Sequence, residues 1–204
     1  MGDAQIGIVL DRTNFYAEMG GQVADTGLMA DNADEVDFVV QNVKKSGPYI
    51  LHVGLLQRGN IKVGDQLSLL YHGERRRAIM SNHTATHLLN FALRDVLKEA
   101  EQDGSLVDPD KLRFDVRHGK QINVEELAQI EAIVQSIVNE NKDVSSKEVA
   151  LDQARHIVGL RTLAGEAYPN PVRVVAVGAD VNELLTNPQS PLSLQNSVEF
   201  CGGT

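Results

Sequence analysis

The sequence predicts an α+β protein in which a small N-terminal β-barrel is followed by a layered α/β domain with an antiparallel sheet. Two observations predict this order. The first 73 residues hold short apolar runs separated by glycine turns, which is typical of a small barrel. After Gly73, long helical patterns alternate with isolated strand patterns, which is typical of a layered domain. We therefore expect two domains, at residues 1–73 and 74–204.

The barrel strands are predicted from apolar runs that end at turn-forming residues. Such turns stand at Gly20-Gly21, Ser46-Gly47-Pro48 and Gly64-Asp65. The predicted strands are residues 6–10, 37–40, 49–53 and 66–70.

The second domain shows recognisable helix starts. Ser81 or Asn82 can cap a first helix, and Asn123 with Glu126 forms a capping-box pattern that opens a long one. We expect helices at 81–100, 123–141 and 180–185, a short helix opening at 145–148, and strands at 112–116, 171–177 and 197–200.

Composition limits the possible functions. No apolar run reaches the roughly 18 residues of a membrane span, so we expect no membrane contact. The net charge of −9 argues against a generally basic nucleic-acid-binding face. The single cysteine, Cys201, allows no internal disulfide, which favours a reducing, cytoplasmic location.

The most specific chemical signal is a histidine pair with a distant cysteine. His83 and His87 are four apart, so they lie on one face of a helix, and Cys201 can bring a thiolate to the same ion. Two imidazoles and a thiolate suit Zn²⁺. No glutamate follows His83, so this is not the metalloprotease motif. A coincidental surface pair and a buried apolar thiol explain the same residues without a metal.

Three further segments carry candidate binding residues, each with a simpler explanation. Gly20-Gly21 can hold a backbone close to a ligand with Gln22 as donor and acceptor, or can form a plain turn. Arg75-Arg76-Arg77 can contact phosphate or form a solvated face. Thr84 and Thr86 can line a polar pocket or lie at the surface.

Four segments resemble motifs of alanyl-tRNA synthetases, in the order found in that family. They are FYAEMGGQVADTG at 15–27, NHTATHLLN at 82–90, LRFD at 112–115 and VEFCGGT at 198–204. Residues 171–175 are similar to the eukaryotic cytosolic branch.

The resemblance implies the editing region of such an enzyme, which hydrolyses tRNA(Ala) mischarged with serine or glycine at a zinc site. It implies His83, His87 and Cys201 as zinc ligands, with a further histidine at position 205, beyond the sequence given. It also implies that the full-length enzyme attaches alanine to tRNA(Ala) with ATP. This chain, which lacks the aminoacylation segment, is expected to work with the remaining domains and not to charge tRNA alone.

The resemblance also assigns roles to the other candidates. Gln22, Thr84 and Thr86 are expected at the catalytic site. Gly20, Gly21 and Gln22 are expected to hold the substrate, and the arginines Arg75, Arg76 and Arg77 to contact the tRNA backbone.

Three alternatives remain open. The chain can be a free-standing trans-editing deacylase of the same superfamily. It can be related to the editing domain of threonyl-tRNA synthetase, which is not expected to carry the Gly20-Gly21-Gln22 block. It can also be an inactive, zinc-stabilised tRNA-binding module that needs metal to fold.

Overall fold

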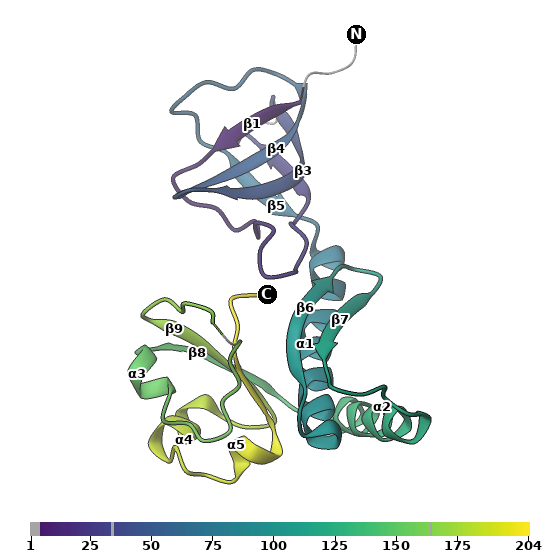
Figure 1. Ribbon diagram of the computed structural model, residues 1–204. Helices are drawn as coiled ribbons and strands as arrows, with labels where there is room; N and C mark the ends of the chain where they lie inside the picture. Colours follow the sequence, from purple (N-terminus) through teal and green to yellow (C-terminus); the bar gives the residue numbers. More distant parts are fainter. Residues whose placement is uncertain (1–4, 34, 164) are drawn as a thin grey trace. The chain divides into compact units, whose positions relative to one another are not determined.

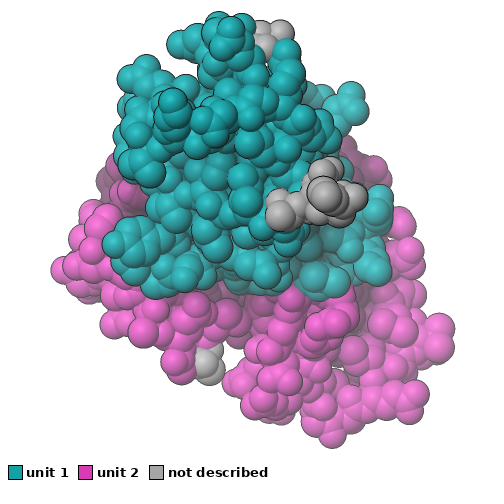
Figure 2. All heavy atoms as spheres, turned by 90° about the horizontal axis from the view of Figure 1, so that it is seen from above, with its two compact units in different colours: residues 1–83, 106–112, 203–204 teal, residues 84–105, 113–202 magenta. Residues whose placement is uncertain are grey.

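The computed structural model describes residues 5–33, 35–163 and 165–204, and the chain forms two compact units (Figure 2). Unit 1 comprises residues 1–83, 106–112 and 203–204, and unit 2 comprises residues 84–105 and 113–202. The elements, labelled in Figure 1, are β1 (Ile6–Val9), β2 (Gly27–Ala30), β3 (Asp37–Ser46), β4 (Tyr49–Arg58), β5 (Ser68–Tyr71), α1 (Gly73–Leu97), β6 (Glu101–Val107), β7 (Leu112–Arg117), α2 (Val124–Asn139), β8 (Val144–Val149), α3 (Leu151–Ala154), β9 (Val172–Val177), α4 (Val181–Thr186), α5 (Leu192–Gln195) and β10 (Ser197–Phe200).

Unit 1 is built on a five-stranded antiparallel sheet in the order β1-β4-β3-β2-β5. The end strands β1 and β5 do not pair with each other within the described residues, so the sheet is open and the predicted closed barrel is not confirmed. The lengths of the strands give a physical reason. β1 and β5 have four residues each, against ten in β3 and in β4, and therefore offer few backbone groups for a closing ladder.

The core of unit 1 follows the two-residue period of its strands. Phe38 and Val40 alternate with more exposed neighbours on β3 and are almost fully buried, together with Met29 on β2. The four predicted strands are present with shifted ends, and β2 is an additional strand that the sequence analysis missed.

Helix α1 begins at Gly73 rather than at the predicted residue 81. Strong helix formers fill the stretch between, and Ile79 there is fully buried. The predicted caps lie inside the helix. The Ser81 hydroxyl donates to the Arg77 carbonyl, and the Asn82 amide donates to the Asp108 carbonyl at 2.9 Å. The boundary between the two units falls within α1, directly after His83.

Unit 2 contains a three-stranded antiparallel sheet in the order β10-β9-β8. The prediction of a helix opening at 145–148 is wrong, because these residues belong to β8. Ser145 to Glu148 carries a local capping pattern, but the segment pairs with β9 from Val144 opposite Val177 to Val149 opposite Val172. This ladder with a central strand outweighs the local helix signal.

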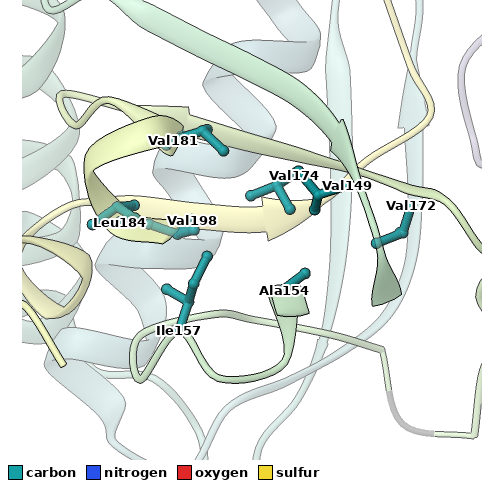
Figure 3. Packing of buried hydrophobic residues seen from close by; sticks show 9 residues of the cluster. Val149, Ala154, Ile157, Val172, Val174, Val181, Leu184 and Val198 are labelled. Carbon is teal, nitrogen blue, oxygen red and sulfur yellow. The ribbon is translucent and has the colours of Figure 1, made fainter. Parts of the chain in front are cut away.

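The apolar core of this sheet lies against α3 and α4, as Figure 3 shows. Val174 and Val198 are fully buried on neighbouring strands, and Leu184 of α4 packs against them. The predicted strands at 171–177 and 197–200 and the predicted helix at 180–185 are confirmed as β9, β10 and α4.

A second core of unit 2 joins α1 to α2 beside the two-stranded sheet β6-β7. Ala92, Leu93 and Leu97 on α1 are buried together with Ile130 on α2. The capping box at Asn123 is present as predicted. Within the described residues, no helix is long and apolar enough to cross a bilayer.

Candidate metal centre

The two histidines lie one turn apart on α1, as their spacing predicts. Each is 8% exposed, so both imidazoles are buried. An α-helix places residues i and i+4 on the same face, which makes this pair a rigid two-nitrogen platform.

His87 is oriented by a buried carboxylate from β10. Its Nδ1 lies 2.8 Å from Oε2 of Glu199, and the other oxygen, Oε1, accepts from Asn90 Nδ2 at 2.8 Å. Since an ionised carboxylate only accepts, Nδ1 of His87 carries the hydrogen and Nε2 is the ring nitrogen that can coordinate an ion.

The charges around His87 favour a cation. Burial disfavours the imidazolium, but hydrogen bonds and charge interactions with Cys201 and Glu199 outweigh it and raise the pKa of His87 to about 10. The side chains of Cys201 and Glu199 therefore both favour positive charge at His87. A proton on His87 or a bound metal ion can supply that positive charge.

His83 is oriented in a similar way by a residue of unit 1. Its Nδ1 lies 2.7 Å from Gln22 Oε1, which also accepts from the backbone N and the hydroxyl of Thr204, both at 3.1 Å. Because a backbone N–H can only donate, the Gln22 atom must be the oxygen. His83 then donates through Nδ1, and Nε2 is again the ring nitrogen that can coordinate an ion.

The glycine turn holds Gln22 in place. Gly20 and Gly21 have φ values of +60° and +84°, and the backbones of Met19 and Gln22 bond to each other across this turn. Two successive positive φ values are typical of a type I′ turn and favour glycine. Gln22 is fully buried, and its Nε2 has no hydrogen-bond partner within the described part of the chain.

The three predicted ligands meet in a geometry that fits a metal ion. One ligand atom each from His83, His87 and Cys201 lies within 4.8 Å of the others. Tetrahedral coordination places such atoms roughly 3.5 Å apart. The approach also requires a small residue at position 203, since a Cβ on Gly203 would clash with the His83 ring. The donor set and its hydrogen-bonded support therefore fit a bound ion.

The other predicted site residues differ in their burial and in their contacts. Thr84 is half-buried and Thr86 buried on α1. Arg75 donates to the Ala24 carbonyl at 2.7 Å, and Arg76 forms a salt bridge with buried Asp25. Arg76 also stacks over the Tyr71 ring. Arg75 and Arg76 thus contribute to the folding of unit 1, and Arg77 is exposed.

Comparison with known proteins identifies the family. A family model described as tRNA synthetases class II (A) matches residues 2–75. The cytoplasmic alanine–tRNA ligase of Bombyx mori is 47% identical over 202 residues, which is 98% of this chain and 21% of that protein. The chain belongs to the alanyl-tRNA synthetase family.

Other members of the alanyl-tRNA synthetase family match to a similar extent. The alanine–tRNA ligase of Candida albicans is 48% identical over 98% of this chain and 21% of its own length. The mitochondrial alanine–tRNA ligase of Saccharomyces cerevisiae is 47% identical over 97% of this chain and 20% of its own length. The chain therefore spans about a fifth of the length of these relatives.

Sequence reasoning missed Glu199 and Asn90, which orient His87. A signal for each was present. Glu199 stands two residues before Cys201, so in a strand it shares a face with the cysteine, and Asn90 stands three after His87 on the same helix face. Neither contact was predicted, because the sequence does not show which distant carboxylate reaches His87 or that Asn90 donates to it.

Proposed function

We propose that this chain is the part of an alanyl-tRNA synthetase that hydrolyses tRNA(Ala) mischarged with serine or glycine. The observation that carries the proposal is the group of His83, His87 and Cys201, whose ligand atoms all lie within 4.8 Å of one another and in which each imidazole has its Nδ1 atom hydrogen-bonded to Gln22 or Glu199. The relatives are named alanine–tRNA ligases, which supports tRNA(Ala) as the substrate class.

Zn²⁺ is the ion that this donor set fits best, because imidazole nitrogen and thiolate sulfur are its preferred ligands. His83 and His87 would hold it through Nε2, and Cys201 through Sγ. When bound, zinc supplies a Lewis acid that polarises a carbonyl or lowers the pKa of a water molecule. Glu199 and Gln22 keep the two imidazoles in the binding tautomer.

Selectivity for serine over alanine requires a group that recognises the serine hydroxyl. Gln22 Nε2 is a buried donor without a partner in the described residues, and it belongs to the side chain that holds His83. A substrate hydroxyl would satisfy it, whereas alanine would leave it unpaired at a cost of about 1–3 kcal/mol. Thr84 and Thr86 are proposed as further polar contacts.

The remaining roles concern the whole enzyme. We propose that residues 1–73 carry the glycine-rich block and residues 74–204 the zinc-dependent site. The longer protein would attach alanine to tRNA(Ala) with ATP in the cytoplasm, and Gly20, Gly21 and Arg75, Arg76, Arg77 would hold the charged tRNA.

Deacylation of tRNA(Ala) carrying serine tests the proposal, with correctly charged alanine as control. The assay compares this chain with one extended by a histidine at position 205. Release of serine, but not of alanine, by either chain supports the editing site, and the difference between them measures the effect of the added histidine. Release by neither folded chain contradicts the proposal and favours a tRNA-binding module.

Cys201→Ala provides the matched variant. We expect it to abolish serine release while the far-ultraviolet circular dichroism spectrum stays unchanged, because it removes a proposed ligand and not a core side chain. A folded Cys201→Ala chain with normal deacylation would exclude a catalytic metal at this position.

A further inference from the structure

A cavity of about 830 Å³ in unit 2 has no role in the proposed hydrolysis. It is lined at the C-terminal end of α1 by Arg94 and Lys98, at the end of β7 by Arg117 and His118, and at the 158–161 segment by Arg161. The cationic side chains concentrate here although the chain as a whole has a net charge of −9.

Arg94 provides the first evidence that the cavity accepts an anion. Its side chain is half-buried, and its Nε atom is buried without a hydrogen-bond partner in the described part of the chain. An unmet charged donor is costly, so such an atom is normally paired in the functional state. No carboxylate of the described residues accepts a hydrogen bond from Arg94 Nε.

Arg161 lines the same cavity as Arg94 and makes two contacts with the protein. Its guanidinium stacks over the Phe91 ring at 4.8 Å, and Nη1 donates to the Asn196 carbonyl at 3.3 Å. Burial lowers the pKa of Arg161, the charge of Glu199 opposes this, and the charge of Arg94 lowers it further. Two guanidinium groups that repel each other in a partly buried cavity are stabilised by an anion between them.

His118 adds a different requirement. Its Nδ1 donates to the Glu99 carbonyl at 2.6 Å, so in the neutral ring Nε2 carries the lone pair. That Nε2 atom is also buried without a partner within the described residues. The cavity thus combines an unmet donor with an unmet acceptor, and an anion without a hydrogen-bond donor would leave the acceptor unsatisfied.

Acidic residues near the cavity offset the charge of some of its cationic side chains. Glu99 and Glu101 also line it, Asp95 pairs with Lys98, and Asp103 pairs with Arg117. Lys98 and Arg117 are thus largely exposed to water, which screens their charge, and each already faces a carboxylate, whereas Arg94 and Arg161 are half-buried. Arg94 and Arg161 therefore provide the positive charge for a ligand, and a ligand that binds here must be held by these two side chains.

We propose that this cavity binds one backbone unit of RNA, with the phosphate between Arg94 and Arg161 and a ribose 2′-hydroxyl donating to His118 Nε2. A phosphodiester matches a pair of guanidiniums, and the 2′-hydroxyl is the donor that distinguishes RNA from DNA. The proposal rests on the proposed function in one respect: it takes tRNA as the RNA that is bound.

Binding of a fluorescently labelled tRNA(Ala) transcript, titrated at several salt concentrations, tests the proposal. Arg94→Gln is expected to weaken binding and to reduce the slope of log affinity against log salt by about one, the value for one lost phosphate contact. The matched control is Arg155→Gln, an exposed arginine of unit 2 that does not line the cavity. It should leave the slope unchanged.

A second comparison tests the acceptor. The unmodified chain should bind the RNA transcript more tightly than DNA of the same sequence, and His118→Phe should narrow that difference. Arg94→Lys keeps the positive charge and should restore the salt slope that is reduced in Arg94→Gln. Such a restoration would show that the reduced slope comes from the lost charge and not from misfolding.

Equal salt slopes for the original chain and Arg94→Gln would overturn the proposal. Inorganic phosphate that binds the chain more tightly than the RNA does, without displacing the RNA, would also overturn it. The outcome is independent of the hydrolysis assay. Serine release with unchanged slopes leaves the proposed function standing and removes this inference. A reduced salt slope in Arg94→Gln without serine release supports this inference and contradicts the proposed function.

Discussion

At the scale of single residues, two buried histidines differ because of their neighbours. His52 in unit 1 lies among apolar residues and bonds to the Ile8 carbonyl, and burial lowers its pKa despite that bond. His87 is also buried, yet Cys201 and Glu199 raise its pKa to about 10. The same side chain is thus a neutral core residue in one place and a group that favours positive charge in the other.

His52 makes stability dependent on pH. The fold favours its neutral form, in which Nδ1 donates to Ile8 and Nε2 accepts from Thr13 at 2.8 Å. The stabilisation is complete above the unfolded pKa of about 6.5 and is lost as pH falls towards the lower folded pKa. In urea titrations, the free energy of unfolding should fall between pH 7.5 and pH 5.5 by up to about 1.4 kcal/mol per pH unit. This fall should be smaller in His52→Gln. The control His72→Gln, at an exposed position, should keep the loss. Equal pH dependence in all three chains would refute this role.

Glu199 should control metal affinity without being a ligand. Glu199→Gln keeps the shape of the side chain and an acceptor for Asn90, but it removes the negative charge next to His87. We expect zinc affinity, measured by competition with a chelating dye, to fall about 10–100-fold. Glu183→Gln, at an exposed position on α4, is the matched control. An unchanged affinity in Glu199→Gln would show that the carboxylate does not support the ligand.

At the scale of elements, local signals succeed where the chain itself supplies the partners. The α2 helix starts where its capping box predicts, because Asn123 and Glu126 bond to each other's backbone. In β8 the similar pattern at Ser145 and Glu148 fails, since the partner of that segment is β9. A local pattern is reliable only when no distant strand competes for the same backbone groups.

The capping box of α2 can be tested directly. Asn123→Ala removes the side chain that accepts from the Glu126 backbone at 2.8 Å. We expect the free energy of unfolding to fall by about 0.5–2 kcal/mol in a denaturant titration. Gln121→Ala, an exposed change two residues earlier, should have a much smaller effect. A loss of the same size in both variants would mean that the cap is not the cause.

At the scale of the whole molecule, the apolar cores are local to each unit. One core lies in the open sheet of unit 1, and two lie in unit 2 around β9 and between α1 and α2. The long helix α1 carries both His83 and His87, so their spacing is fixed by the helix itself.

The sequence by itself predicted the grouping of His83, His87 and Cys201, most of the strands and helices, and the family. These features are set by short-range spacing or by motifs: two histidines four positions apart, a capping box and the glycine-rich block. Each can be read locally because helix and strand periods fix which neighbours share a face.

Only the tertiary structure decided what surrounds those residues. Glu199 reaches His87 across 112 positions of sequence, and Gln22 reaches His83 across 61. The open edge of the first sheet, the strand at β8 and the cavity between Arg94 and Arg161 arise in the same way. The physical reason is that hydrogen-bond partners and burial depend on which distant segments pack together, and no local period encodes that choice.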